Sequence, residues 1–572
     1  MTMISPKSME TVQRWLNDPY VDEETKSELR ALENDQAELE DRFYRDLEFG
    51  TGGLRGVIGA GSNRINKYTV GRATQGLAEY IKAIHGDADG KPSVVIAHDS
   101  RHFSPEFALE AALVLAGNGI VAKLYPSLRS TPQLSFSVRH LGATGGIVIT
   151  ASHNPPEYNG YKVYNSEGGQ LVPHEAERVI ALIQQVDSFA AIRRLSREEA
   201  EAQGLLVWLG EAEDRAFIDT VASVSVNREL IASKLADDFT IVFTPLHGTG
   251  NMPVRQVLET IGFKHVHVVK EQEQPDGGFP TVKSPNPEER EAFTLAMKVG
   301  EEIQADILIG TDPDADRMGA VVKNGKGEYV VLTGNQSGAI MIHYLLSQLK
   351  ETGKLPHNGA VIKTIVTSEM GAAIAEHYGA TIFNTLTGFK YIGEKMTQFE
   401  QTGDYTYLFG YEESYGYLAG NYARDKDAVL ASMLICEAAA YYKAQGKTLY
   451  DVLQELYEQF GFFLESLESR TLKGKDGLAQ IQAKMADWRS QPPQQVAGLA
   501  VEKVLDYSQG LDGLPKENVL KYMLEDGSWF CLRPSGTEPK IKVYFAVRGA
   551  SLEDAERKIE SLRDEVMARV DG

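Results

Sequence analysis

Short apolar runs rich in β-branched residues alternate with longer stretches of helical spacing along most of the chain. The runs have the length and composition of buried strands, and the clearest lie at 93–97, 121–125, 146–150, 240–243 and 360–366. Between the first two, residues 104–117 have the pattern of a helix. Strands that alternate with helices predict an α/β fold, in which sheets lie between layers of helices.

The chain has 572 residues, which is too long for a single hydrophobic core. Units of similar size follow one another until about residue 447, where the sequence becomes helical and charged before two final strand-like runs. We expect three similar α/β domains with mixed sheets and a smaller C-terminal α+β domain, at 1–208, 209–326, 327–446 and 447–572. The first 48 residues are predicted to be a helical extension that packs on the first domain.

Composition narrows the classes of function. Apolar residues make up 42% and charged residues 24% of the chain, values typical of a soluble globular protein. The net charge of −22 argues against non-specific binding to nucleic acid or to anionic membranes. An anionic substrate would therefore be held by local cations and not by the field of the whole protein.

Cysteine content and the lengths of apolar runs indicate the cellular compartment in which the protein is expected. Only Cys436 and Cys531 are present, so neither a disulfide framework nor a cysteine-type zinc site is available. No apolar run approaches the ~20 residues that span a bilayer, and the N-terminus lacks the apolar core of a signal peptide. We expect a cytoplasmic enzyme acting on small molecules, a monomer or weak homo-oligomer, without nucleic-acid or membrane partners.

Residues 150–156 read Thr-Ala-Ser-His-Asn-Pro-Pro and follow a strand-like run. Ser152 is therefore expected just beyond a strand end, where the two prolines stop the chain from continuing as strand or helix. A serine in such a rigid turn is placed like a nucleophile, although the Gly-x-Ser-x-Gly frame of the α/β-hydrolases is absent. His153 is adjacent, but neighbours in sequence do not automatically face each other. Taken alone, the stretch is better explained as a capped strand-to-loop turn.

Residues 310–317 read Gly-Thr-Asp-Pro-Asp-Ala-Asp-Arg, also after a strand-like run. Asp312, Asp314 and Asp316 recur at a spacing of two, so a tightly curved loop can turn their carboxylates toward one hard cation such as Mg²⁺. An EF-hand is excluded, because its glycine and glutamate positions hold arginine and lysine. The alternative is an acidic surface turn, but like charges so close at a strand end need a counter-ion.

Two further loops carry polar side chains that could bind a ligand. Residues 410–416 contain Glu412 and Ser414, which can accept and donate hydrogen bonds to hydroxyl groups, although in isolation an acidic turn is an equally good interpretation. Near the C-terminus, an Arg-Pro-Ser-Gly-Thr loop lies between two strand-like runs and has the composition of a phosphate cradle. Its members are Arg533, Ser535, Gly536 and Thr537.

Several isolated polar residues have two interpretations each. Arg101 follows a strand end and is as readily structural as catalytic. His247 follows another strand and is either a hydrogen-bonded structural histidine or a catalytic one. The glycine-rich stretch 50–56 is either a flexible turn or the support of Arg55. Lys162 lies on a strand expected to return toward the Ser152 loop.

The motifs that contain Ser152, Asp312, Glu412 and Arg533 occur in the order seen in the α-D-phosphohexomutases, which this sequence resembles over nearly its whole length. Four motifs in the right order are more specific than any one of them. The metal loop, Thr-Asp-Pro-Asp-Ala-Asp-Arg, is most similar to that of the bacterial phosphoglucomutase branch, which also contains phosphopentomutases. Phosphomannomutase-type enzymes tend to carry Asp-Gly-Asp-Gly-Asp-Arg and Gly-Glu-Met-Ser instead.

The resemblance implies an active site in a central cleft between the domains. Its catalytic residues would be Ser152, His153, Arg55, Lys162 and Lys390. The metal site would consist of Ser152, Asp312, Asp314 and Asp316. The substrate would contact Glu412, Ser414, Arg317, Arg533, Ser535, Gly536 and Thr537.

The resemblance also implies a reaction. Ser152 would carry a phosphoryl group and pass it to glucose 1-phosphate, and the resulting glucose 1,6-bisphosphate would turn over and return its other phosphate. Mg²⁺ and the bisphosphate would be the cofactors. A metal-dependent phosphatase with a phosphoserine intermediate would need no second phosphate cradle, so the Arg533 loop argues against it. A catalytically inactive sugar-phosphate sensor would be expected to lose Ser152 or an aspartate, and none is missing. Phosphopentomutase and glucose 1,6-bisphosphate synthase activities stay open, with phosphomannomutase less favoured.

Overall fold

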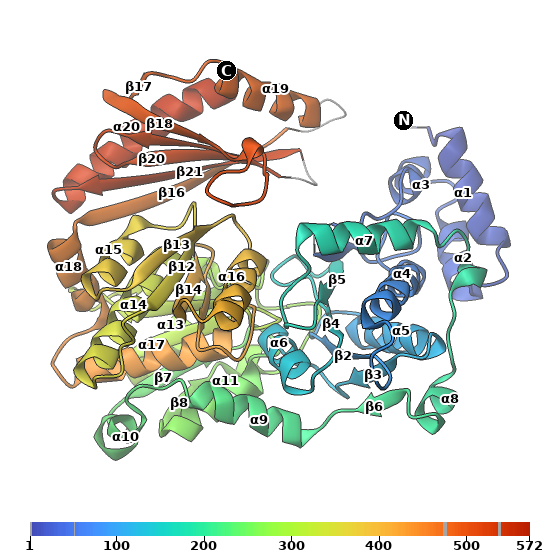
Figure 1. The fold of residues 1–572 in the computed structure, drawn as a ribbon, viewed down its shortest axis with the longest axis horizontal. Helices are drawn as coiled ribbons and strands as arrows, with labels where there is room; N and C mark the ends of the chain where they lie inside the picture. Colours follow the sequence, from blue (N-terminus) through green and yellow to red (C-terminus); the bar gives the residue numbers. More distant parts are fainter. Residues whose placement is uncertain (1–2, 51, 473–476, 536–538) are drawn as a thin grey trace.

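The structure, a computed structural model, describes residues 3–50, 52–472, 477–535 and 539–572. Within these residues the chain forms three α/β units, each built around a sheet with parallel and antiparallel neighbours, and then a unit with an antiparallel sheet (Figure 1). The predicted fold class, three similar α/β domains followed by a smaller C-terminal domain, is confirmed.

The first unit contains a six-stranded sheet in the order β1-β5-β4-β2-β3-β6. Its strands are β1 (Gly53–Val57), β2 (Ser93–His98), β3 (Val121–Leu124), β4 (Gly145–Ile149), β5 (Tyr158–Tyr164) and β6 (Leu206–Trp208). Its helices are α4 (Lys67–His85), α5 (Ser104–Gly117), α6 (Thr131–His140), α7 (Pro173–Gln184) and α8 (Arg197–Ala202). Alternate residues of β2 pack on opposite faces: Val94 and Ile96 face α4 and α5, whereas Val95 and Ala97 face α6.

The glycine-rich stretch at 50–56 contributes the strand β1, which pairs antiparallel with β5. Gly53 has a φ of 143°, and a Cβ at this position would lie 1.8 Å from the carbonyl oxygen of Tyr161. Glycine is therefore required here because the two strands approach too closely for any side chain. The same pairing aligns Arg55 with Gly160 and Gly53 with Lys162.

Three N-terminal helices, α1 (Pro6–Asn17), α2 (Glu23–Ala31) and α3 (Gln36–Phe43), pack on the first unit, as predicted. Trp15 makes edge contacts with the rings of Phe43, Tyr68 and Phe189 at centroid distances of 5.2–5.6 Å. The side chain of Arg42 donates to the carbonyl of Ala60 at 3.0 Å. The helices thus hold the chain that leaves β1.

The second unit is a five-stranded sheet in the order β11-β10-β9-β7-β8. Its strands are β7 (Thr240–Thr244), β8 (His265–Val268), β9 (Ile307–Thr311), β10 (Met318–Lys323) and β11 (Tyr329–Val331). Its helices are α9 (Glu211–Ala222), α10 (Arg228–Leu230), α11 (Asn251–Ile261), α12 (Lys270–Glu273) and α13 (Thr294–Ile303).

The third unit is a four-stranded sheet in the order β13-β12-β14-β15. Its strands are β12 (Gly359–Thr364), β13 (Thr381–Thr385), β14 (Thr406–Glu412) and β15 (Gly416–Ala419). Its helices are α14 (Gly334–Glu351), α15 (Glu369–His377), α16 (Phe389–Thr402), α17 (Ala428–Lys443) and α18 (Leu449–Phe460). Helix α17 also packs on β9 and β10, so the second and third units share one hydrophobic core.

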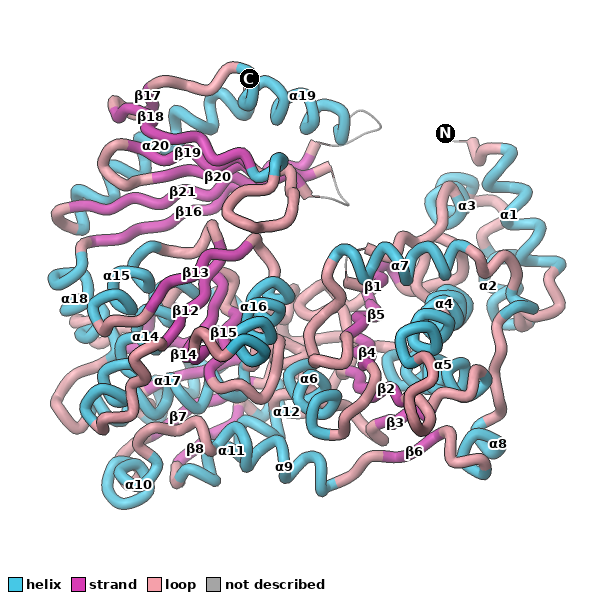
Figure 2. The backbone as a smooth tube through the Cα atoms, in the orientation of Figure 1, coloured by secondary structure: helices cyan, strands magenta, loops and turns pink. Residues whose placement is uncertain are grey.

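The C-terminal unit is a six-stranded antiparallel sheet in the order β16-β21-β20-β19-β18-β17. Its strands are β16 (Phe462–Thr471), β17 (Gln495–Val496), β18 (Leu499–Asp506), β19 (Leu520–Leu524), β20 (Trp529–Pro534) and β21 (Lys540–Gly549). Helices α19 (Gly477–Ser490) and α20 (Leu552–Asp571) cover one face, and the other face packs on the third unit (Figure 2). The expected boundary at 446/447 falls ahead of α18, which packs with α14, α15 and α17.

Candidate active site

The loop after β4 presents Ser152 at a strand end, where the sequence pattern puts it. Ser152 has a φ of 53°, a left-handed conformation that is uncommon outside glycine. Its N–H donates to Thr150 Oγ1 at 2.8 Å, which ties the turn to the end of the strand. Backbone strain at one polar residue in an ordered turn is typical of functional sites.

The side chain of Arg101 fixes the Ser152 turn by hydrogen bonds to its main chain. Its side chain is fully buried, and its guanidinium donates to the carbonyl oxygens of Ser152, Asn154, Pro155 and Tyr158, the last two at 2.8 and 3.1 Å. All four acceptors are main-chain atoms of the loop. Of the two interpretations of Arg101, the structural one therefore holds: it sets the shape of the serine loop.

A buried carboxylate completes this support. Asp99 accepts hydrogen bonds from the Arg101 N–H at 2.9 Å, from Ser104 Oγ at 2.8 Å and from Thr150 Oγ1 at 2.6 Å. Its charge also lies 3.4 Å from Arg101 Nε. A buried ion pair is tolerated when hydrogen bonds satisfy its remaining atoms, as they do around Asp99.

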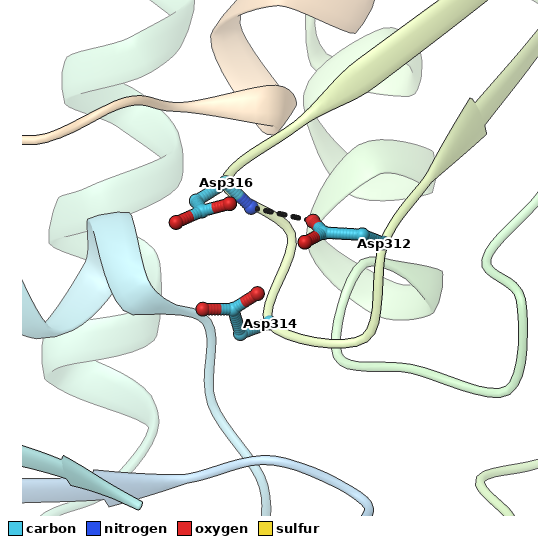
Figure 3. A group of neighbouring side chains, drawn as sticks. All are labelled: Asp312, Asp314 and Asp316. Atoms are coloured by element: carbon cyan, nitrogen blue, oxygen red, sulfur yellow. Dashed lines mark hydrogen bonds between the residues drawn. The ribbon is translucent and has the colours of Figure 1, made fainter. Parts of the chain in front are cut away.

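The three predicted aspartates converge on one point between β9 and β10 (Figure 3). All three side chains are buried, and one oxygen of each lies within 4.8 Å of the others. Asp312 Oδ1 accepts the N–H groups of Asp316 and Arg317, each at 3.0 Å, which curls the loop back on itself. Asp312 Oδ2 accepts a hydrogen bond from Ser152 Oγ at 2.6 Å. The serine loop and the aspartate loop, 160 residues apart in sequence, therefore meet.

The donor set fits a divalent cation. Asp314 Oδ1 and Asp316 Oδ1 are buried and have no hydrogen-bond partner within the part of the chain that the structure describes. Buried carboxylate oxygens without partners are rare and costly, and a hard cation would satisfy both of them at once. The oxygen-only set suits Mg²⁺ better than zinc or copper.

The pKa values of the triad show the same need for positive charge. Burial, followed by the charges of Asp314 and Asp316, raises the pKa of Asp312 well above its usual range. Burial also raises the pKa of Asp314, but Lys162 and the hydrogen bonds to Asp314 outweigh it and the net shift is downward. Three carboxylates at this spacing cannot all be charged without counter-ions.

Basic side chains from two other units surround the triad. Lys162 Nζ lies 2.8 Å from Asp314 Oδ2 and 3.6 Å from Asp316 Oδ2. Lys426 Nζ, from the third unit, lies 3.1 Å from Asp316 Oδ2. Arg55 lies on the same face of the β1–β5 pair as Lys162, because opposed residues of an antiparallel pair share a face. The predicted cations Arg55 and Lys162 are thus brought to the same side of the sheet.

His153 stands beside the serine. Its Nδ1 lies 3.3 Å from Ser152 Oγ. Burial, then the charges of Arg317 and Arg55, lower its pKa well below the ordinary value, so the imidazole is neutral. A neutral imidazole next to a hydroxyl can accept the hydroxyl proton.

Arg317 directly follows the last aspartate of the loop. Its Nη1 pairs with Glu288 Oε1 at 2.6 Å. Burial lowers its pKa, but the charges of Glu288, Asp316 and Asp312 outweigh this and raise it, so the guanidinium is always charged. The candidate sugar residue Glu412 also contributes to this shift.

The end of β14 and the turn that follows it carry the two candidates for sugar recognition. Glu412 is 5% exposed, and its Oε1 accepts the N–H of Gly388 at 2.9 Å. Ser414 is half-buried on the turn. The carbonyl of Tyr415 accepts the N–H of Met318 at 3.1 Å, so this turn is joined directly to the strand that leaves the aspartate loop.

The last candidates lie on the C-terminal sheet. Arg533 on β20 is directly opposite Lys542 on β21, so the two side chains share a face. Arg533 Nε lies 3.1 Å from Glu517 Oε1, and the N–H of Ser535 donates to the Lys540 carbonyl at 2.7 Å. The predicted cradle residues Gly536 and Thr537 lie outside the described residues.

The charges of the C-terminal sheet and of the other units act on one another. Burial, then the charges of Arg533 and Lys540, lower the pKa of Lys542; the charge of Glu413 opposes this shift and that of Arg317 adds to it. Burial lowers the pKa of Lys390, at the start of α16, and Arg533 lowers it further. The predicted lysine of the third unit and the predicted arginine of the fourth therefore face a common region.

Several residues around the candidate site could not be predicted from the sequence. Lys426 lies in a run of four charged residues that looks like a solvated surface, and Glu288 lies in an unremarkable acidic loop. Thr131, whose Oγ1 donates to Asp314 Oδ2 at 2.7 Å, lies at the start of a helix and gives no signal. His247 is hydrogen-bonded to the Gln274 carbonyl at 3.1 Å and to Thr281 Oγ1 at 2.9 Å, so the structural interpretation holds for it.

Sequence profiles of known families match most of the chain. Those described as Phosphoglucomutase/phosphomannomutase, alpha/beta/alpha domains I, II and III match residues 46–189, 215–326 and 333–460. The profile of the C-terminal domain of the same family matches residues 472–564.

Whole proteins are similar over nearly their full lengths. A phosphoglucomutase from Staphylococcus haemolyticus is 37% identical over 531 residues, 91% of this chain and 94% of the relative. One from Staphylococcus aureus is 36% identical over 542 residues, with 92% and 94% covered. A solved structure of parafusin, a phosphoglucomutase from Paramecium, has a TM-score of 0.68 at 19% identity, covering 92% of this chain and 95% of that one. No helix within the described ranges combines the length and apolar character needed to cross a bilayer.

Proposed function

The chain belongs to the phosphoglucomutase/phosphomannomutase family, isomerases that move a phosphoryl group within a sugar phosphate, and we propose that it interconverts glucose 1-phosphate and glucose 6-phosphate. The preference for glucose is supported by the phosphoglucomutase relatives at 36–37% identity. In this proposal Ser152 carries a phosphoryl group, and glucose 1,6-bisphosphate is both intermediate and activator.

The observation that carries the proposal is the meeting of Ser152 with the aspartate triad. Ser152 Oγ lies 2.6 Å from Asp312 Oδ2 and 3.3 Å from Nδ1 of neutral His153. When Oγ attacks phosphorus, the P–O bond to the sugar breaks, His153 Nδ1 can accept the serine proton, and the leaving sugar oxygen takes up a proton to become a hydroxyl. In the reverse direction a sugar hydroxyl attacks phosphorus and gives up its proton to solvent, the bond between Oγ and phosphorus breaks, and His153 can return a proton to Oγ.

Charge neutralisation at the phosphoryl group is the second part of the mechanism. Mg²⁺ held by Asp312, Asp314, Asp316 and the Ser152 phosphate would supply positive charge to the oxygens of the transferring group. Even with this ion, three aspartates and a phosphate dianion leave a charge of about −3. Lys162, Lys426, Arg55 and Arg317 lie close enough to offset it.

Two-sided recognition of the sugar is the third part. A mutase must hold the same sugar in two orientations, with either phosphate at Ser152. Glu412 and Ser414 are proposed to bind hydroxyls that are presented alike in both orientations. Lys390, Arg533, Ser535, Gly536, Thr537 and Lys542 are proposed to hold the phosphate that is not reacting.

Intact-mass measurement of the freshly purified enzyme, followed by peptide mapping, tests the central step. We expect one phosphate on Ser152, and none on a Ser152→Ala variant. Conversion of glucose 1-phosphate, mannose 1-phosphate and ribose 1-phosphate, measured in parallel, tests the sugar preference. A fully active enzyme without phosphate on Ser152, even after incubation with glucose 1,6-bisphosphate, would exclude the proposed mechanism.

A further inference from the structure

The loop between β18 and β19 brings a carboxylate to the positively charged face of the C-terminal sheet. Hydrogen bonds close its ends: the Tyr507 N–H donates to the Val519 carbonyl at 3.0 Å, and the Glu517 N–H donates to the Tyr507 carbonyl at 3.1 Å. Leu511 and Leu514 pack on the apolar cluster that joins this unit to the third. The position of the Glu517 side chain is therefore set by an ordered loop.

Glu517 lies among cations from two units. Its Oε1 is 3.1 Å from Arg533 Nε, and both side chains are about a quarter exposed, at 27% and 26%. Its negative charge also acts on Lys390 of the third unit, where it opposes the effect of burial. Lys542 shares the sheet face of Arg533. The three cations proposed to bind the non-reacting phosphate thus have an anion of the protein among them.

We propose that the Glu517 carboxylate competes with the non-reacting phosphate for the guanidinium of Arg533. This competition weakens binding of that phosphate, so that the bisphosphate intermediate can dissociate from its cations and reorient. This inference rests on the proposed function, since only a mutase must hold the non-reacting phosphate during transfer and release it once in each cycle. When phosphate leaves, the carboxylate pairs with the guanidinium again. This return lowers the cost of an otherwise unpaired, partly buried charge.

Removal of the negative charge therefore has a distinctive consequence. Glu517→Gln keeps an oxygen that can accept from Arg533 Nε, so the guanidinium stays oriented, but the repulsion of a phosphate dianion is lost. Substrate binds more tightly, while turning of the intermediate becomes slower. We expect the KM for glucose 1-phosphate to fall about three- to tenfold, as for the loss of one partly exposed charge interaction, and kcat to fall with it.

The experiment compares Glu517→Gln with Asp512→Asn, which removes the same charge from the exposed tip of the same loop. Asp512 has a φ of 52°, a conformation that asparagine also adopts, so the control does not disturb the backbone. Four quantities are measured: KM and kcat on glucose 1-phosphate, the concentration of added glucose 1,6-bisphosphate that gives half-maximal activity, and the affinity for glucose 6-phosphate by calorimetry on a Ser152→Ala background.

The proposal expects tighter glucose 6-phosphate binding, a lower kcat and a lower requirement for added bisphosphate in Glu517→Gln alone. Weaker binding would mean that Glu517 only positions Arg533, and constants equal to those of Asp512→Asn would remove any role; either result overturns the proposal. Glu517→Ala must shift binding in the same direction as Glu517→Gln. A wild-type enzyme that does not convert glucose 1-phosphate counts against the proposed function, whereas the calorimetric comparison judges Glu517 separately.

Discussion

Replacing the fully buried Arg101 should change the geometry of the Ser152 loop without removing any group that reacts. Lysine at this position keeps the positive charge next to Asp99, which preserves the buried ion pair. Its single ammonium cannot reach the four carbonyls of Ser152, Asn154, Pro155 and Tyr158 at once. Arg101→Lys should therefore loosen the serine turn and leave the fold standing.

The magnitude follows from the bonds lost. Each hydrogen bond from a charged donor contributes about 1.5–3 kcal/mol, and two or more are lost, but the loop can relax and part of the effect is recovered by water. We expect a loss of about 2–4 kcal/mol in the free energy of unfolding of the first unit. A displacement of the reacting oxygen by about 1 Å costs about 100-fold in rate. We therefore expect kcat to fall about 100-fold with KM nearly unchanged, because no substrate contact is removed.

The assay couples formation of glucose 6-phosphate to its dehydrogenase and is paired with thermal unfolding. Arg72→Lys is the matched control: Arg72 pairs with Asp46 at 2.6 Å and donates to the Val186 carbonyl at 3.0 Å, in the same unit but away from the serine loop. Its kcat should stay within about twofold of wild type, because it does not touch the reacting groups. A folded Arg101→Lys enzyme with normal kcat would show that the turn keeps its shape without these bonds.

Three further substitutions test other parts of the site. Asp314→Asn should lower transfer about 100-fold or more at limiting Mg²⁺ with little loss of fold, because the ion stabilises charge that develops during transfer; near-normal kcat in low magnesium would rule out the metal site. Glu412→Gln keeps the acceptor for Gly388 but loses the charge, so discrimination among sugar phosphates should fall by about 1.5–3 kcal/mol; an unchanged preference ratio across the three sugars would argue against recognition by this residue. Arg533→Ala should raise KM about 10- to 150-fold, more than it lowers kcat, and increase the need for added bisphosphate. An unchanged KM would favour a phosphatase over a mutase.

The α/β fold class and two site loops could be predicted from the sequence because their signals are local. The run before Ser152 and the run before Asp312 are short, apolar and β-branched, and the candidate site residues follow within a few positions. The meeting of the two loops could not be derived in this way, since nothing local relates residues 160 positions apart. Only the resemblance to a known family implies that the Ser152 loop and the aspartate loop meet.

Other residues discussed above could not be predicted from the sequence, for different physical reasons. Lys426 and Glu517 lie in charged stretches, and a charged side chain is solvated far more often than it is paired inside a protein. Strand β1 was open to interpretation as a flexible turn, because its glycines mimic a loop. Gly53 is needed because the main chain of β5 passes too close for a side chain there, which the sequence of β1 alone does not reveal.

The N-terminal helices have a consequence for how this protein can be divided. The family profile of the first domain begins at residue 46, yet Trp15 lies ahead of it and packs on Tyr68 and Phe189 within it, and Phe43 packs on Trp15 in turn. A chain trimmed to the profile would present two aromatic rings to water and leave the Ala60 carbonyl without Arg42. The first unit with this aromatic cluster intact is therefore larger than the segment that the profile matches. Shortened versions for crystallisation or display should retain the helices from Pro6 onward.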